Sequence, residues 1–375
     1  MRVIFMAAAG LGHIHPVIPL ARAAAAAGDE VLFAVPAEAL PRIEAFGFAA
    51  TAVPFGDPAD IGRAWANLPD HDLNSYVVAD IFLRIHGRAA LPALRDLIAS
   101  FRADLLVSAE MGALVAAEAS GVRSGMLGIT ALDLPDLDLT RVTAALDDLR
   151  ESAGLPRSDR MPYDSGSRFL SALPPLLWAD PAHQPKDAVW FRHEDAEGPV
   201  RSAPHSARPR PRPQVYATLG SVAGENDFGR PIFRLVLAAL GRLDADALFT
   251  VGPFDRAQLG AVPANVTIAA YAPQAEAMEC DVVVTHAGSG TTVAALTRGL
   301  PLVAVPMFAD QMHNADRLVA AGVGVRVDPD EVSVGLTVAI ERVLRDPNYR
   351  MKAQHIAADI AARPSPAEAL DLLRT

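Results

Sequence analysis

One stretch of the sequence combines an apolar strand, a histidine and the start of a helix, an arrangement that suits an anion. Val282–Thr285 is apolar and β-branched, and it is followed by His286, Gly288 and Gly290. The first turn of a helix has free N–H groups and a positive dipole end, so it attracts phosphate, and glycines let the backbone come close. His286 would add a hydrogen-bond donor, and a charge when it is protonated. Hydroxyl side chains that could cap this helix or bond phosphate follow at Ser289, Thr291 and Thr292.

A histidine in the first half has the chemistry of a general base. His13 follows the strand expected over Arg2–Met6, in a small-residue loop that also holds Gly10 and Gly12. An unperturbed imidazole titrates near pH ~6.5, which suits proton removal. The glycines leave room for a substrate, but they do not complete a dinucleotide fingerprint, because His15 stands in place of the third glycine. His15 is a second candidate base, although we expect it to cap a helix.

A carboxylate follows another strand and could support this base. Glu110 lies just beyond the strand expected over Leu105–Ser108, and the carboxyl ends of parallel strands share one edge of a sheet. There the carboxylate could orient the His13 ring and stabilise its protonated form, as the third member of a catalytic triad does. The alternative for Glu110 is an exposed loop residue or a helix cap.

Three motifs in the second half could contact the other parts of a nucleotide. Gly220 and Ser221 follow the strand expected over Val215–Leu219, which again places a turn and a hydroxyl at a strand end. Tyr271 precedes a proline turn and Gln274, so a flat ring could stack on a base and an amide could bond the edge of that base. Polar side chains that suit sugar hydroxyls open a later helix at Asp310, Gln311 and Asn314.

Composition narrows the class of protein. The chain has 375 residues and a hydrophobic content of 51%, enough for two packed domains. Its net charge of −11 argues against nucleic acid, which requires a basic face, and against an anionic membrane surface. The single cysteine, Cys280, excludes an intrachain disulfide, and we expect it to be a small buried side chain. With no leader peptide and no apolar run long enough to span a bilayer, we expect a cytoplasmic protein without stable membrane insertion.

Short apolar runs alternate with helical patterns in both halves, which predicts an α/β fold with parallel sheets. In the first half we expect strands at 2–6, 30–35 and 105–108, with helices near 16–27 and 113–119. In the second half we expect strands at 215–219, 247–251, 266–270, 282–285, 302–305 and 324–327, with helices at 227–242, 289–298 and 310–321. The segments 55–75 and 132–164 look loop-like. The second of these holds Asp133, Asp136 and Asp138, which we expect to form an exposed acidic loop and no metal site.

A Pro-dense segment at 201–213 is expected to link the two halves. We therefore expect a first domain over 1–200, a second domain over 214–362, and a C-terminal helix over 363–375 that packs back toward the first domain. Ligands bind beyond the carboxyl ends of strands in such sheets. Two Rossmann-like domains with facing sheets would then hold a site in the cleft between them.

With these motifs the chain resembles nucleotide-sugar-dependent glycosyltransferases of the GT-B fold. It is most similar to the UDP-glycosyltransferase-like family, in the branch that decorates bacterial natural products, over nearly its whole length. The resemblance is strongest at 218–221, 271–274, 286–291 and 306–311. Two positions depart from the family pattern: Tyr271 stands where Trp is usual, and Ala287 stands where Gly or Cys is usual.

The resemblance also implies roles for individual residues. His13 matches the catalytic base, and Glu110 matches the acid that supports it. The nucleotide-sugar donor would be bound by Gly220, Ser221, Tyr271, Gln274, His286, Gly288, Ser289, Gly290, Thr291, Asp310 and Gln311, with Gly12 and Asn314 as further contacts.

The implied activity is an inverting transfer of a deoxysugar from a nucleotide diphosphate, with dTDP as the expectation for this branch. The acceptor would be a hydroxyl of a hydrophobic natural-product aglycone, deprotonated by His13. Helix N–H groups, His286 and Ser221 would stabilise the leaving diphosphate, so that no metal or other cofactor is needed. Domain closure about the 202–213 segment would assemble the site. The oligomeric state is open, and a homodimer is compatible with the resemblance.

Other functions are compatible with the same residues. A C-glycosyltransferase or a nucleotide-sugar epimerase could use this fold and donor site. A partner protein of another class could bind nucleotide-sugar or aglycone without catalysis, although the presence of His13 argues against it.

Overall fold

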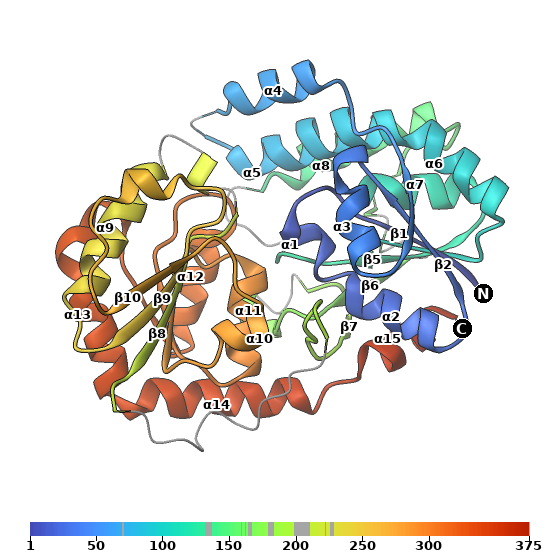
Figure 1. Ribbon diagram of the computed structural model, residues 1–375. Helices are drawn as coiled ribbons and strands as arrows, with labels where there is room; N and C mark the ends of the chain where they lie inside the picture. Colours follow the sequence, from blue (N-terminus) through green and yellow to red (C-terminus); the bar gives the residue numbers. More distant parts are fainter. Residues whose placement is uncertain are drawn as a thin grey trace. The chain divides into compact units, whose positions relative to one another are not determined.

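The computed structural model describes residues 1–69, 71–131, 137–158, 160–161, 163, 167–178, 184–198, 211–221, 223–225 and 229–374. The chain forms two compact units (Figure 1). The first unit comprises Met1–Phe191 and Pro364–Thr375, and the second unit comprises Arg192–Arg363. The second unit therefore lies between two parts of the first along the chain. Most of the expected linker, residues 201–210, lies outside the described residues.

Each unit is built on one parallel sheet, as the alternating pattern predicts. The first sheet has the spatial order β3 (Ala49–Ala52), β2 (Glu30–Val35), β1 (Arg2–Met6), β4 (Leu105–Ser108), β5 (Arg123–Leu127), β6 (Arg168–Ser171) and β7 (Val189–Trp190). The second has the order β10 (Val266–Ala269), β9 (Asp246–Thr250), β8 (Gln214–Thr218), β11 (Val282–Thr285), β12 (Leu302–Ala304) and β13 (Gly324–Arg326). Every neighbouring pair in both sheets is parallel.

Both sheets reverse their strand order at an interior position. In the first sheet the reversal lies between β1 and β4, and in the second it lies between β8 and β11. Helical connections on the two sides of such a point run to opposite faces of the sheet, which leaves the carboxyl ends of the two strands uncovered. The sequence places His13 and Glu110 beyond the first pair of strands, and Gly220 and His286 beyond the second.

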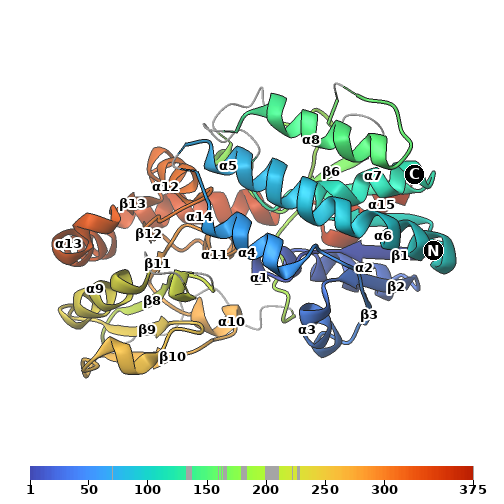
Figure 2. The ribbon, with the colours of Figure 1, turned by 90° about the horizontal axis from the view of Figure 1, so that it is seen from above.

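Helices cover both faces of the first sheet. Figure 1 shows α2 and α15 on one face, and α6, α7 and α8 on the other. The helices of this unit are α1 (Leu11–Ile14), α2 (Ile18–Ala26), α3 (Leu40–Ala45), α4 (Pro58–Ala66), α5 (Leu73–Tyr76), the π-helix η2 (Val77–Gly87), α6 (Arg88–Phe101), α7 (Met111–Ala119), α8 (Leu139–Ser152) and α15 (Pro366–Arg374). The segments α5, η2 and α6 follow one another without a break and form one long helical run in Figure 2.

Alternate side chains of the second sheet pack into two cores, as the two-residue repeat of a strand requires. On one face Val282 and Val284 join a cluster that includes Phe233 of α9. On the other face Val283 joins a cluster that contains Cys280, which confirms the expected burial of that thiol. The helices of this unit are α9 (Arg230–Gly241), α10 (Gln274–Ala277), α11 (Ser289–Thr297), α12 (Gln311–Ala320), α13 (Val332–Arg345) and α14 (Pro347–Ala361). Short 3₁₀ turns occur at Ala37–Ala39, Pro175–Leu177, Ala223–Glu225, Arg256–Leu259 and Pro329–Glu331.

The first segment expected to be a loop, Phe55–Ser75, contains the helix α4, so that prediction was wrong. Oδ1 of Asp57 accepts the Ala59 N–H at 2.7 Å, and Pro58 occupies the first helical position. An Asp N-cap followed by Pro is a strong start signal for a helix. The helix lies on the surface and buries only Ala64, so it lacks the apolar content that marks a core-facing helix.

The second segment expected to be a loop, 132–164, contains α8, which corrects the prediction there as well. Oδ1 of Asp138 accepts the Thr140 N–H at 2.8 Å, so this aspartate is the N-cap of α8. The many Asp and Pro residues around the helix obscured its buried face, on which apolar residues recur at helical spacing: Val142, Ala145, Leu146 and Leu149.

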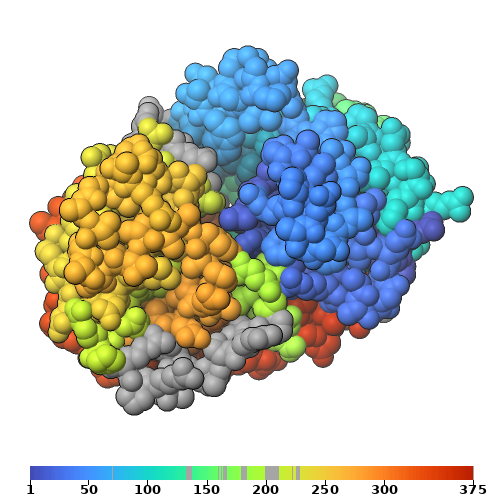
Figure 3. Space-filling view, in the orientation of Figure 1, coloured from blue at the N-terminus to red at the C-terminus, as the bar shows by residue number. Residues whose placement is uncertain are grey.

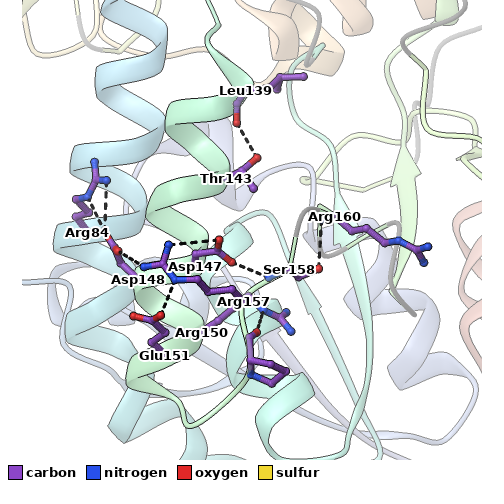
Figure 4. A network of polar contacts seen from close by, with 11 residues as sticks. Arg84, Leu139, Thr143, Asp147, Asp148, Arg150, Glu151, Arg157, Ser158 and Arg160 are labelled. Carbon is purple, nitrogen blue, oxygen red and sulfur yellow. Dashed lines mark hydrogen bonds and ion pairs between the residues drawn. The ribbon is translucent and has the colours of Figure 1, made fainter.

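The chain after α8 is tied back to that helix by polar contacts (Figure 4). Nε of Arg157 lies 2.5 Å from the Glu151 carboxylate, and the Ser158 N–H donates to Asp147 at 2.8 Å. A cavity of about 790 Å³ lies beside them. Its lining includes neither His13 nor Glu110, and the exposed ion pairs around it contribute little stability.

The surface of the first unit includes α4, most of whose side chains are exposed (Figure 3). Trp65 on this helix is 45% exposed. Among the described residues, no helix is both long enough and apolar enough to cross a membrane.

Candidate active site

His13 and Glu110 meet at the reversal point of the first sheet. Nδ1 of His13 lies 2.7 Å from Oε1 of Glu110. The side chain of His13 is 22% exposed and that of Glu110 is 6% exposed, so the carboxylate is not an exposed loop group. Glu110 occupies the N-cap position of α7, but its carboxylate makes no cap hydrogen bond there. We expected His13 in a loop, and the structure places it in the single helical turn α1.

Strand register explains why this pair forms. Met6 of β1 pairs with Ser108 of β4, so the residues that follow the two strands leave the sheet side by side. The Ala8 N–H donates to Oε1 of Glu110 at 3.3 Å. The Glu110 N–H donates to the Ser108 hydroxyl oxygen at 2.8 Å, which fixes the backbone of the glutamate.

Glu110 is ionised in spite of its burial. Burial by itself raises the pKa of a carboxyl group, because the charged form loses water. The charge of His13 and its hydrogen bond, supported by the charge of His86 and the Ala8 N–H, hold the pKa of Glu110 below its ordinary value. The carboxylate can therefore accept a hydrogen bond from Nδ1 of His13. Because Nδ1 faces Glu110, Nε2 is the ring atom suited to exchange a proton with a substrate.

The structure adds two side chains near His13 that the sequence did not predict. Phe82 meets the His13 ring edge-on, with 5.7 Å between ring centroids, and His86 lies 5.6 Å from Phe82. Burial lowers the pKa of His86, and the charge of Glu110 opposes this effect. Nδ1 of His86 is buried without a hydrogen-bond partner among the described residues. The spacing of four residues between Phe82 and His86, which suits one helix face, is the signal that could have found them.

His15, the other candidate base, takes a different position. Its ring packs edge-on against Phe46, with 5.8 Å between ring centroids. The residue ends α1 at the C-cap position.

In the second unit His286 lies against two glycines at the reversal point. A methyl group built on Gly220 would lie 2.7 Å from Nε2 of His286, and one built on Gly288 would lie 2.3 Å from the same atom. These glycines therefore make room for the His286 ring. Apart from its chain neighbours and its own helix backbone, no described residue has an atom within 4 Å of a methyl group built on Gly290, so the backbone there is open.

His286 is neutral near pH 7. Burial lowers the pKa of its ring to about 4, although the charge of Asp310 and a hydrogen bond with the Thr218 backbone act in the opposite direction. The ring can therefore serve an anion as a hydrogen-bonding group, without the charge that protonation would add. The attraction for an anion then comes from α11, whose N-cap is Gly288 and has no side chain to occupy the first N–H groups.

A polar network joins the start of α11 to the start of α12. The Ser289 hydroxyl donates to Oδ2 of Asp310 at 2.9 Å. Nδ2 of Asn314 donates to the same oxygen at 3.0 Å and to the Ala287 carbonyl at 3.0 Å. Ala287 has a φ of 65°, a left-handed conformation that costs a residue with a Cβ roughly 1–2 kcal/mol. The departure from Gly at this position therefore carries backbone strain.

Three further candidates on α11 and α12 differ in their burial and in their hydrogen bonds. Oε1 of Gln311 accepts the N–H groups of Met307 and Phe308 at 2.9 and 3.2 Å, so this buried side chain holds the loop before α12. Thr292 is fully buried, and its hydroxyl has no hydrogen-bond partner within the described part of the chain. Thr291 lies one residue earlier at a partly exposed position.

Tyr271 and Gln274 form a further group with a residue that the sequence did not predict. The Tyr271 hydroxyl donates to Oε1 of Glu197, and the Gln274 N–H donates to Oε2 of the same carboxylate at 3.1 Å. Tyr271 is 52% exposed, which leaves its ring accessible to a ligand. Ser221, beyond β8, is also exposed.

Metal ions require a set of ligand side chains that lie close together. Within the described ranges, no group of three or more His, Cys, Asp or Glu side chains could hold a metal ion. Asp138 serves as the cap of α8, whereas Asp133 and Asp136 lie outside the described residues.

Comparison with known proteins identifies the family. Residues 234–374 match the family described as erythromycin biosynthesis protein CIII-like, C-terminal domain. The chain is 30% identical to the L-demethylnoviosyl transferase of Streptomyces niveus, over 98% of this chain and 96% of that protein. The chain belongs to the bacterial natural-product glycosyltransferases. The elloramycin glycosyltransferase ElmGT of Streptomyces olivaceus is another relative of this glycosyltransferase, 29% identical over 100% of this chain and 97% of that one.

Solved glycosyltransferase structures share the fold of this chain. The glycosyltransferase SnogD from Streptomyces nogalater matches with a TM-score of 0.78 and 25% identity, over 100% of this chain and 98% of that one. VinC matches with a TM-score of 0.77 and 23% identity over the same shares. The expected GT-B fold and the enzyme class, a nucleotide-sugar-dependent glycosyltransferase, are therefore confirmed.

The low pKa of His286 predicts that acid destabilises this glycosyltransferase. A depressed folded pKa contributes stability above the unfolded value, near ~6.5, and that stability is lost as the pH falls toward the folded value, about 4. His286→Asn should therefore lose less unfolding free energy than wild type between about pH 7 and about pH 5 in denaturant titrations. Burial lowers the pKa of His86 as well, so the acid-dependent loss of unfolding free energy in His286→Asn should be smaller than in wild type but not zero. Equal losses in both proteins would contradict the role of burial at His286.

A matched pair of glycine substitutions tests the packing around the His286 ring. Gly288→Ala should destabilise the fold by about 1–3 kcal/mol, because the new methyl group would overlap the ring. Gly290→Ala should be neutral or stabilising by up to about 1 kcal/mol, because that methyl group meets open space within a helix. Thermal unfolding of the two variants measures the difference. Similar melting temperatures for both would show that the ring moves aside at no cost.

Proposed function

We propose that this glycosyltransferase moves a deoxysugar from a dTDP-linked donor to a hydroxyl of a hydrophobic acceptor, with inversion at the anomeric carbon. The observation that carries the proposal is the 2.7 Å contact between Nδ1 of His13 and the buried, ionised carboxylate of Glu110. Such a pair can take a proton on the other ring nitrogen and stabilise the resulting imidazolium, which is the task of a general base.

In the proposed step, Nε2 of His13 accepts the proton of the acceptor hydroxyl. The hydroxyl oxygen uses an electron pair to form a bond to the anomeric carbon of the sugar. The bond from that carbon to the diphosphate oxygen breaks, and its electron pair leaves with dTDP. Attack on the face opposite the leaving group inverts the anomeric configuration, through a transition state with oxocarbenium character.

The second unit supplies the groups proposed to hold the leaving diphosphate. The start of α11 offers N–H groups and the positive end of the helix dipole, and the neutral His286 ring can add a hydrogen bond. Donors that are already in place stabilise charge as it develops. We assign the diphosphate to Gly220, Ser221, His286, Gly288, Ser289, Gly290 and Thr291, the base to Tyr271 and Gln274, and the sugar to Asp310, Gln311, Asn314 and Gly12.

The choice of dTDP and of a natural-product acceptor draws on related proteins. VinC was solved in complex with dTDP, and SsfS6 of Streptomyces sp. SF2575 was solved with thymidine diphosphate. Other relatives are named for elloramycin, aklavinone and tylactone. A hydrophobic aglycone is therefore the acceptor class that we propose for this chain.

Replacement of the proposed base tests the mechanism. His13→Ala should lower turnover by about 10²- to 10⁴-fold, because proton removal is lost. Its calorimetric affinity for dTDP should be unchanged. His15→Ala is the matched control, since His15 packs on Phe46, and it should keep its turnover. Near-wild-type turnover of His13→Ala with several aglycones would refute the proposal.

We also propose that transfer needs no divalent metal, because helix N–H groups and the helix dipole stabilise the diphosphate. Turnover should therefore survive an excess of EDTA. Inhibition by EDTA that added magnesium reverses would overturn this part of the proposal.

A further inference from the structure

The carboxylate of Glu197 bridges the two residues assigned to the base. One oxygen accepts the Tyr271 hydroxyl, and the other accepts the Gln274 backbone N–H at 3.1 Å. The bond from Tyr271 holds the end of the ring, and the bond from Gln274 holds the start of α10. One side chain thus fixes the ring relative to the turn that carries it.

Glu197 comes from the first residues of the second unit, which we call the strap, residues 192–198. The strap is anchored two residues before Glu197, at Asp195, which is 3% exposed. The Asp195 carboxylate pairs with Nη2 of Arg298, and Nε2 of His193 lies 3.5 Å from its other oxygen. Burial by itself raises the pKa of Asp195, but His193 and the charge of Arg298 hold that pKa below its ordinary value, so the anchor is ionic.

The anchor lies on the helix that also carries the proposed diphosphate site. Arg298 is the C-cap residue of α11, and its Nη1 donates to the Ala294 carbonyl at 3.1 Å. The strap therefore connects the end of α11 to the turn that carries Tyr271. Its position is set by an ion pair that is largely excluded from water, where charges interact more strongly than at the surface.

A half-exposed aromatic ring needs such a restraint to act as a platform. Tyr271 is 52% exposed, so packing against neighbours covers only about half of it. A ring that rotates freely in the empty protein loses that freedom when a base stacks on it, and the lost entropy weakens binding. Because the Tyr271 hydroxyl is already bound to the Glu197 carboxylate, part of this entropy is lost before the ligand binds.

We propose that Glu197 is a positioning residue that holds the Tyr271 ring in place for the nucleotide base of the donor. It acts through Tyr271 and through the Gln274 N–H, and it does not touch the reacting atoms. The inference rests on the proposed function, because it takes a nucleoside diphosphate as the ligand. It adds a residue of the strap to the groups that decide donor affinity.

The test is a double-mutant cycle on dTDP affinity, measured by calorimetry on the full chain. Glu197→Ala and Tyr271→Phe should each weaken dTDP binding by about threefold to tenfold, as expected for one partly exposed hydrogen bond to a charged group. The double variant should be no weaker than the weaker single variant, because both changes remove the same contact. In steady-state assays Glu197→Ala should raise KM for the donor and leave kcat unchanged.

The affinity for inorganic pyrophosphate distinguishes a loss of base positioning from a general loss of the donor site. Pyrophosphate carries the charge of the diphosphate without a base, so its affinity should be equal in wild type and in all variants. Glu194→Ala is the matched control, because Glu194 is an exposed carboxylate of the same strap that faces Arg192 at 3.4 Å. It should bind dTDP as wild type does. Glu197→Gln, which keeps an acceptor oxygen for Tyr271, should recover part of the loss.

The outcomes separate this inference from the proposed function. Additive losses in the cycle, or equal losses for dTDP and pyrophosphate, would overturn the role of Glu197 while wild-type binding of dTDP leaves the proposed function standing. Wild-type affinity in Glu197→Ala would overturn the inference in the same way. Failure of the wild-type protein to bind dTDP would instead overturn the proposed donor, and the inference with it.

Discussion

Both halves of the proposed chemistry depend on the reversal of strand order within each parallel sheet. At that point the connections from neighbouring strands leave toward opposite faces, so the strand ends between them are not covered by a crossover helix. His13 and Glu110, 97 positions apart in the chain, approach to 2.7 Å because β1 and β4 are neighbours there. Gly220 and His286 approach for the same reason beyond β8 and β11. Each pair therefore depends on its whole sheet, and no local segment could form it.

The two histidines show how surroundings decide the role of one residue type. His13 has an ionised carboxylate in hydrogen-bond contact, which suits the general-base role proposed for it. His286 lies in a crowded position between glycine backbones, and burial keeps its ring neutral. In the proposed site a neutral ring would give the diphosphate a hydrogen bond but no charge. The charge that would attract the anion is then the partial charge of a helix end, which does not change with pH.

The sequence was most informative where physical constraints are local or where strands are buried on both faces. The apolar runs at β1, β4 and β11 coincide with the observed strands, because strands covered on both faces are apolar almost throughout. The contact of His13 with Glu110 could be expected because both residues follow parallel strands, whose carboxyl ends share one edge of a sheet. The helices α4 and α8 were missed, although each begins at an aspartate cap. The helix α4 buries only one residue, and the buried face of α8 stands among many Asp and Pro residues. Glu197 was missed because its partners, Tyr271 and Gln274, are brought to it only by long-range packing, which no local pattern reports.

The helix α15 has a consequence for how the protein is made. It follows the second unit in the chain, yet it packs against α2 and β5 of the first, where Leu373 fills the space beside Gly125. Residues 192–363 are therefore synthesised before the first unit has all the segments of its core, because α15 comes after them in the chain. The unit that is synthesised first is thus the last to be finished.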